Sequence, residues 1–181
     1  METHPYPPYN AEKCSILFLG SFPPKATYQR DGEPLPSFYY QSTRNQFWKI
    51  IDLIFGTDLY LSSLEDPVAL QKNVSDKKEF LLKNSLGMAD IIYRCERKKA
   101  SASDADIGVL EFLDINRLVA SNRNLKTILC TSSFVYRLCC RELSYEVDVG
   151  KLPSPSPRSI MSLDKKTGHY KDVISRYLYI S

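Results

Sequence analysis

Short apolar runs alternate along this chain with longer amphipathic segments. The apolar runs predict buried strands, because they are short and are bounded by turn-forming residues. The first run stops at Gly20, where the residues change from apolar to turn-forming. The predicted strands cover residues 14–19, 88–93, 125–130 and 145–149.

The amphipathic segments predict helices on the spacing of their apolar residues. The clearest helix covers residues 47–55, with Ser42 or Thr43 as the expected N-terminal cap and Gly56 as the stop. Further helices are predicted at residues 74–86, 115–119, 134–143 and 170–178.

The alternation of strands and helices predicts an α/β fold, a three-layer α/β/α sandwich with a central, mostly parallel sheet of about four strands. The connections between the strands are long enough to hold the helices that parallel pairing requires. We expect residues 1–181 to form a single domain, because this length fits one hydrophobic core. In such sheets a ligand binds outside the carboxyl ends of the strands, so the segments after the strands are the candidates for function.

Composition narrows the class of protein. Hydrophobic residues make up 43% of the chain and charged residues 25%, as in ordinary globular proteins. We expect a cytoplasmic protein without a membrane segment, because no apolar stretch is long enough and the N-terminus lacks a signal pattern. The five cysteines lack CxxC spacing and the only histidines are His4 and His169, so neither a metal site nor a cofactor is predicted. The net charge of +3 permits nucleic acid binding without identifying it.

Three segments carry candidate chemistry, and each also has an ordinary structural interpretation. Residues 20–24 form a Gly- and Pro-rich turn whose N–H groups could face a ligand or simply end a strand. The aromatic residues 38–40 lead to Asn45 at a helix start, where its amide either satisfies the backbone or orients a water or a base. Residues 152–159 alternate proline with serine, which predicts a stiff loop, either a connector or a binding element.

Together and in this order, these segments resemble the uracil-DNA glycosylase superfamily. Gly20–Pro23 occupies the place of its first motif, and Tyr40–Trp48 is similar to the aromatic-to-Asn-x-Phe-Trp segment of its mismatch-specific and hypoxanthine-DNA branches. Residues 86–97 and 103–107 resemble the second strand of the hypoxanthine branch and the segment after it. Leu152–Pro157 looks like its second motif. The resemblance spans about residues 14 to 160 and is strongest to the hypoxanthine-DNA (deoxyinosine) glycosylase branch.

The resemblance implies a monofunctional DNA glycosylase that works as a monomer on double-stranded DNA containing a damaged base. It would flip a deaminated base into a pocket and hydrolyse its N-glycosidic bond, with hypoxanthine favoured over uracil and without metal or cofactor. Asn45 would be the catalytic residue, orienting water or the base. The residues implied to bind the base are Gly20, Ser21, Phe22 and Tyr40. Those implied to contact the DNA are Ser154, Pro155, Ser156, Pro157 and Arg158.

The sequence also departs from the family. Phe22 stands where many relatives have an Asp or Asn, and Leu152 replaces a histidine of the classical uracil enzymes. Ser42-Thr43 replaces a His-Pro pair, and residues 131–133 replace an Asn-Gly pair. A catalytically inactive DNA-binding member of the fold is therefore an alternative. So are an unrelated α/β hydrolase, although GxxxxGK[ST] and GxSxG are absent, and a structural partner-binding protein.

Two groups of charged residues complete the expectations. For the acidic residues Asp90, Asp104 and Asp106, surface or helix-capping roles are expected first, because these roles are commoner. A role as auxiliary carboxylates in the reaction is the alternative. Basic residues should flank the cleft and bind phosphates, because the modest net charge requires local clustering. These residues are Lys98, Lys99, Arg158, Lys165 and Lys166.

Overall fold

A four-stranded parallel sheet forms the centre of the protein. The computed structural model describes residues 1–97 and 107–179. The sheet has the order β5-β2-β8-β9, and each pairing in it is parallel. Every residue of β2, β5 and β8 is buried, as expected for a parallel sheet covered on both faces. The strands are β2 (Ile16–Gly20), β5 (Leu86–Asp90), β8 (Thr127–Cys130) and β9 (Asp148–Lys151).

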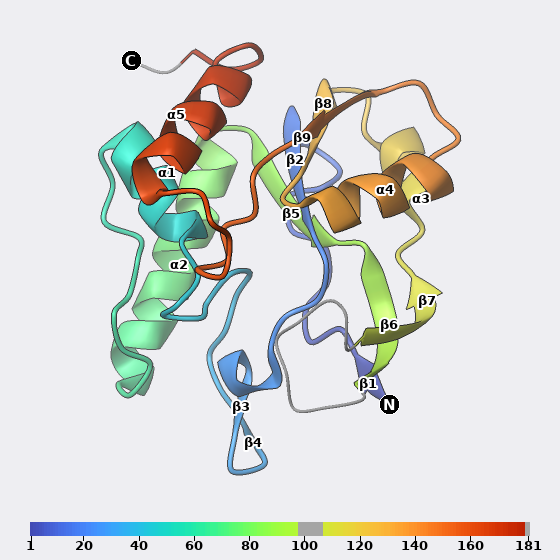
Figure 1. The fold of residues 1–181 in the computed structure, drawn as a ribbon. Helices are drawn as coiled ribbons and strands as arrows, with labels where there is room; N and C mark the ends of the chain where they lie inside the picture. Colours follow the sequence, from blue (N-terminus) through green and yellow to red (C-terminus); the bar gives the residue numbers. More distant parts are fainter. Residues whose placement is uncertain (98–106, 180–181) are drawn as a thin grey trace.

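Helices cover both faces of this sheet, which confirms the predicted three layers (Figure 1). On one face α1 (Phe47–Phe55), α2 (Pro67–Lys83) and α5 (Leu163–Ile174) enclose an aromatic core. On the other face α3 (Ile115–Ser121) and α4 (Ser133–Glu142) enclose a second, largely aliphatic core. In the part of the chain that the structure describes, none of the helices is long and apolar enough to cross a membrane.

A second, antiparallel sheet was not predicted. It contains β1 (Glu2–Thr3), β6 (Ile92–Arg97) and β7 (Ile107–Phe112) in the order β1-β6-β7. The strand expected at residues 88–93 is in fact two strands, because the chain leaves the central sheet after Asp90 and enters the second sheet at Ile92. The apolar residues continue through Ile91 and Ile92, both of which are buried, so the run shows no break at the point where the chain changes sheet.

The segment between β2 and α1 also holds elements that the pattern did not predict. A 3-10 turn, η1 (Lys25–Thr27), is followed by a short hairpin of β3 (Gln29–Arg30) and β4 (Glu33–Pro34). The hairpin projects from the bottom of the molecule in Figure 1. Strands this short leave no alternation to detect.

Several predicted boundaries were wrong for local reasons. Helix α2 begins at Pro67 rather than at residue 74, because the Asp66 carboxylate accepts the first free N–H groups and proline suits a first turn. Gln46 rather than Ser42 or Thr43 stands at the start of α1. The stop at Gly56 is confirmed, with a left-handed φ of 67°. Strand β9 begins at residue 148 and α5 at residue 163, so both predictions were displaced along the chain.

Candidate active site

The carboxyl ends of the central strands open into a cleft of about 470 Å³. Its walls include Ser21 and Phe22 after β2, Asp90 at the end of β5, Thr131 after β8, and residues 154–158 after β9. The loop before α1 closes the cleft from the other side. A cavity of this size is typical of small-ligand sites, and its place at the strand ends is where α/β sheets bind ligands.

The structure brings the sequence-predicted site residues together. Ser21, Phe22, Tyr40, Asn45 and the segment 154–158 all line this one cleft, although they are far apart in the sequence. Their roles in binding and catalysis stay predictions.

Gly20 does not line the cleft but lies directly behind its floor. A Cβ atom at this position would clash with both Asp90 Oδ1 and the Tyr40 hydroxyl. Gly20 therefore permits a close approach of two polar side chains at the end of β2.

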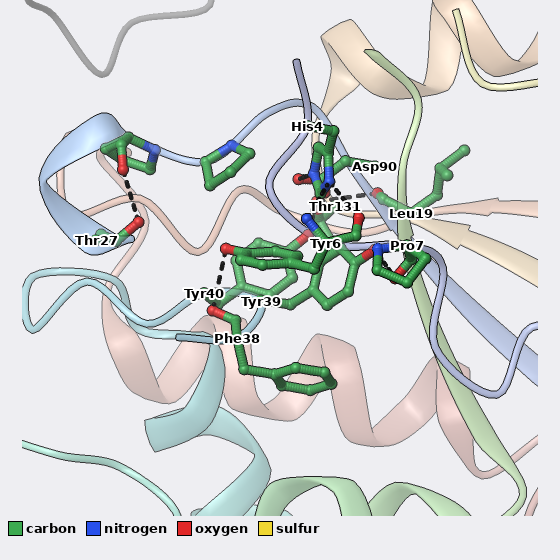
Figure 2. A network of polar contacts seen from close by, with 12 residues as sticks. His4, Tyr6, Pro7, Leu19, Thr27, Phe38, Tyr39, Tyr40, Asp90 and Thr131 are labelled. Carbon is green, nitrogen blue, oxygen red and sulfur yellow. Dashed lines mark hydrogen bonds and ion pairs between the residues drawn. The ribbon is translucent and has the colours of Figure 1, made fainter. Parts of the chain in front are cut away.

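Tyr40 is a rigid part of the wall. Its backbone has a φ of 56°, which is strained for a residue with a side chain, and its ring stacks on Phe47 at a centroid distance of 4.4 Å. Thr131 Oγ1 donates to the Leu19 carbonyl at 3.1 Å, so the Tyr40 hydroxyl must donate to Thr131 over 2.8 Å (Figure 2). Burial, and then the nearby Asp90 carboxylate, raise the pKa of Tyr40, so the hydroxyl keeps its proton.

Asn45 is held by the backbone at the start of α1. Its Oδ1 accepts the Phe47 N–H at 2.9 Å, and its own N–H donates to the Ser42 carbonyl at 2.9 Å. Within residues 1–97 and 107–179, the Nδ2 group has no hydrogen-bond partner. The side chain thus satisfies the backbone through its oxygen and keeps a donor for the cleft, which combines the two interpretations left open by the sequence.

The proline–serine loop is fixed from both sides. The Pro155 carbonyl accepts the Gln46 N–H at 2.8 Å, and the Pro153 carbonyl accepts the Tyr170 hydroxyl at 3.0 Å. The Lys166 ammonium donates to the Ser156 carbonyl at 2.9 Å and to Gln46 Oε1 at 2.7 Å. The loop therefore has a defined shape, set by α1 and α5.

The expectation for Lys166 was wrong. This side chain is buried, and burial lowers its pKa, so it supports the loop from within and cannot reach DNA. Arg44 and Arg158 are exposed and line the cleft, while Lys165 is exposed on α5. Lys98 and Lys99 lie outside the described residues, as do Asp104 and Asp106.

From the sequence alone, too little weight was given to a buried pair of titratable groups, His4 and Asp90. Asp90 lines the cleft, and both residues line a neighbouring cavity of about 310 Å³. His4 Nε2 lies 2.9 Å from Asp90 Oδ2, and the two side chains are only 5% and 7% exposed (Figure 2). His4 comes from the N-terminal segment beside β1, 86 residues before Asp90. Burial and the Asp90 charge raise the pKa of Tyr6 and Tyr39, which pack around His4. The signal available in the sequence was an aspartate inside the otherwise apolar run 88–93.

A second buried charge lies behind the cleft wall. The Lys77 ammonium donates to Gln41 Oε1 at 3.2 Å and lies 5.0 Å from the centroid of the Trp48 ring. Burial lowers the pKa of Lys77 to about 7. Gln41 lines the cleft and is itself buried. Among the described residues, no group of three or more His, Cys, Asp or Glu side chains is placed to hold a metal ion.

Comparison with known proteins identifies the fold. No protein-family model matches the chain. It is similar to the solution NMR structure of a candidate uracil DNA glycosylase from Methanosarcina acetivorans, with a TM-score of 0.66 and 21% identity over 96% of this chain and 99% of that one. The chain has the uracil-DNA glycosylase fold.

A curated relative of this uracil-DNA glycosylase-like chain extends the similarity to the sequence. The chain is 25% identical to a hypoxanthine DNA glycosylase from Methanosarcina barkeri over 178 residues, which cover 97% of this chain and the full length of that protein. The resemblance to the superfamily, and to its hypoxanthine-DNA branch, is thereby confirmed.

Proposed function

We propose that this protein is a monofunctional DNA glycosylase that hydrolyses the N-glycosidic bond of a flipped, deaminated base, with hypoxanthine favoured over uracil. The observation that carries the proposal is the single cleft that joins Tyr40, Asn45 and the proline–serine loop at the carboxyl ends of the strands. The similarity to a hypoxanthine DNA glycosylase supports the choice of reaction.

The base-binding part of the proposal rests on the rigid cleft wall. Tyr40 stacks on Phe47 and is tied to Thr131, so its ring is positioned before any ligand arrives. Phe22, which is buried at the floor, adds a second aromatic surface. A flipped base bound between aromatic side chains recovers part of the stacking that it loses on leaving the duplex.

The DNA-binding part rests on the donors around the rim. Ser154 Oγ accepts the Ser156 N–H and Ser156 Oγ accepts the Arg158 N–H, each at 3.3 Å. Both hydroxyl protons can then be donated to phosphate oxygens. Arg44 and Arg158 add positive charge at the same rim, and phosphate contacts of this kind dominate affinity for duplex DNA.

The proposed chemistry breaks the bond between the sugar C1′ and the base nitrogen, and the electron pair leaves with the base. The Asn45 Nδ2 group would donate to the base carbonyl, where negative charge develops. The DNA phosphates would stabilise the cationic sugar, and a water then adds to C1′ and loses a proton. Asn45 is more suited to the base than to the water, because its oxygen already accepts the Phe47 N–H.

The departures from the family favour a second candidate, a DNA-binding member of the fold without activity. Phe22 and Leu152 are both buried and apolar, so neither can activate water or stabilise a leaving base. The monomeric state and the cytoplasmic location stay predictions.

Base release from defined duplexes tests the proposal. The protein is incubated in excess with duplexes containing one deoxyinosine, one deoxyuridine or no lesion, and abasic sites are revealed by alkaline strand cleavage. We expect cleavage at deoxyinosine, weaker cleavage at deoxyuridine and none in undamaged DNA. Binding to each duplex is measured in parallel. Binding without base release from any lesion would refute the glycosylase and favour the inactive DNA-binding protein.

A further inference from the structure

The His4–Asp90 pair has a proton arrangement that its neighbours determine. His4 Nδ1 lies 2.6 Å from the Tyr6 carbonyl and Nε2 lies 2.9 Å from Asp90 Oδ2. Nε2 and Oδ2 must share a proton, because two acceptors at this distance would repel each other. Whether the histidine or the aspartate holds that proton, it lies on the Nε2–Oδ2 axis.

The other oxygen of the carboxyl group is therefore an acceptor in either case. Asp90 Oδ1 and the Tyr40 hydroxyl both lie against Gly20, where a Cβ atom would clash with each of them, and Asp90 and Tyr40 both line the cleft. The Tyr40 proton is directed to Thr131, so it does not satisfy Oδ1. An acceptor that is nearly buried and faces a ligand cleft selects a donor on the ligand, because leaving it unpaired costs free energy.

The cleft also offers a donor. Asn45 Nδ2 remains available once Oδ1 has accepted the Phe47 N–H. A base that carries a ring N–H next to a C=O, called a lactam edge, would match these two groups. Its N–H would donate to Asp90 Oδ1, and its carbonyl would accept from Asn45 Nδ2. Hypoxanthine and uracil both carry this edge, whereas their amino parents adenine and cytosine present a ring nitrogen that accepts and an amino group that donates.

We propose that Asp90 Oδ1, held as an acceptor by His4, distinguishes a deaminated base from its amino parent by reading the ring N–H while Asn45 reads the carbonyl. The inference rests on the proposed function and names the substrate class of the same cleft. Adenine is rejected because its ring nitrogen would face Oδ1, acceptor against acceptor.

Binding to uncleavable lesions tests this proposal apart from catalysis. Duplexes carry 2′-fluorinated deoxyinosine, deoxyadenosine or unsubstituted purine deoxynucleoside opposite an abasic site, so that no base pair must be broken. The fluorine suppresses cleavage by destabilising the cationic sugar. The wild-type protein is expected to bind the inosine duplex about 10- to 100-fold more tightly than the other two, the range for one well-placed pair of hydrogen bonds to a base.

Asp90→Asn exchanges one oxygen for an amino group at constant size. The remaining oxygen can accept from His4, so the amino group faces the cleft as a donor, and the preference for inosine over adenine should fall at least about 10-fold. Asp58→Asn is the matched control, because Asp58 is exposed in the loop after α1, and it should keep the wild-type preference.

Each outcome decides between the two proposals. An unchanged preference in a folded Asp90→Asn variant overturns the inference, and so does equal binding of inosine and unsubstituted purine by the wild type, which needs no variant. Cleavage of unmodified deoxyinosine is measured on the same samples. A wild type that discriminates in binding but releases no base refutes the hydrolysis while the recognition by Asp90 stands.

Discussion

Replacing Asn45 by aspartate separates its proposed role at the base from its role at the helix start. The variant keeps an oxygen in the place of Oδ1, which can still accept the Phe47 N–H. It replaces the Nδ2 donor by a second carboxylate oxygen, which also adds a negative charge to the cleft. Asn45→Ala, in contrast, removes both groups.

The expected effects differ in size. The retained hydrogen bond contributes about 1 kcal/mol, and a carboxylate near a helix N-terminus is favourable, so Asn45→Asp should change the free energy of unfolding by less than about 1 kcal/mol. Asn45→Ala should lose about 0.5 to 2 kcal/mol of stability, as for other residues that satisfy the first turn. Both should slow base release by about 10²- to 10³-fold, the usual effect of deleting one donor to a developing negative charge.

The assay is single-turnover cleavage of a deoxyinosine duplex, run beside urea unfolding and a binding titration on the same DNA. Duplex affinity should stay nearly unchanged in Asn45→Ala, because the phosphate contacts are intact, and should fall in Asn45→Asp, because the added charge repels the phosphates. Cleavage by Asn45→Asp at the wild-type rate would remove Asn45 Nδ2 from the mechanism. A loss of activity that merely follows the loss of stability across the two variants would show that Asn45 acts through the fold alone.

Three further predictions test the surroundings of the cleft. Gly20→Ala should cost about 1 to 3 kcal/mol of unfolding free energy and weaken inosine binding, because its Cβ would displace Asp90 and Tyr40; wild-type stability in urea would contradict the tight packing. Lys77→Met should be more stable than the wild type by up to about 4 kcal/mol near neutral pH, since the pKa of Lys77 is lowered to about 7 and the unfolded chain binds this proton more tightly. That advantage should shrink as the pH rises from 7 towards 10, and urea unfolding that shows it growing would refute the reasoning. Arg158→Ala should weaken binding equally to damaged and undamaged duplexes and reduce the slope of log affinity against log salt by about one, measured by titration between low and moderate salt; an unchanged slope would remove Arg158 from the phosphate contacts.

The central layers of the fold were predictable because hydrophobic periodicity decides them. The buried runs at residues 14–19 and 125–130 correspond to β2 and β8, and the apolar face at residues 47–55 is α1. The second sheet was not predictable in the same way. Strand β1 has only two residues. Strand β6 begins within the apolar run of β5 and continues through mostly polar residues, so it was not recognised as a separate strand.

The parts of the candidate site that could be predicted are those where an unusual residue type stands next to a predicted helix or strand. Asn45 and the proline–serine loop stand out because their residue types are unusual beside an apolar helix and a strand end. His4 does not stand out, since its meaning depends on a partner 86 residues away and on a two-residue strand that brings them together. Lys166 was misassigned because a lysine side chain is usually exposed, and the oxygens of Ser156 and Gln46 that accept from it become apparent only in the structure.

The His4–Asp90 pair suggests why Phe22 can stand where many members of the superfamily have a polar residue. Phe22 cannot polarise water, but its ring packs edge-on against His4 at a centroid distance of 5.3 Å and helps to exclude water from the His4–Asp90 pair. The polar group at the floor therefore comes from the end of β5 instead of the turn after β2. An acceptor kept in a dry, aromatic surrounding interacts more strongly with a ligand donor than the same group in water. With apolar side chains at Phe22 and Leu152, the proposed recognition rests on two polar groups of the cleft wall, Asp90 and Asn45.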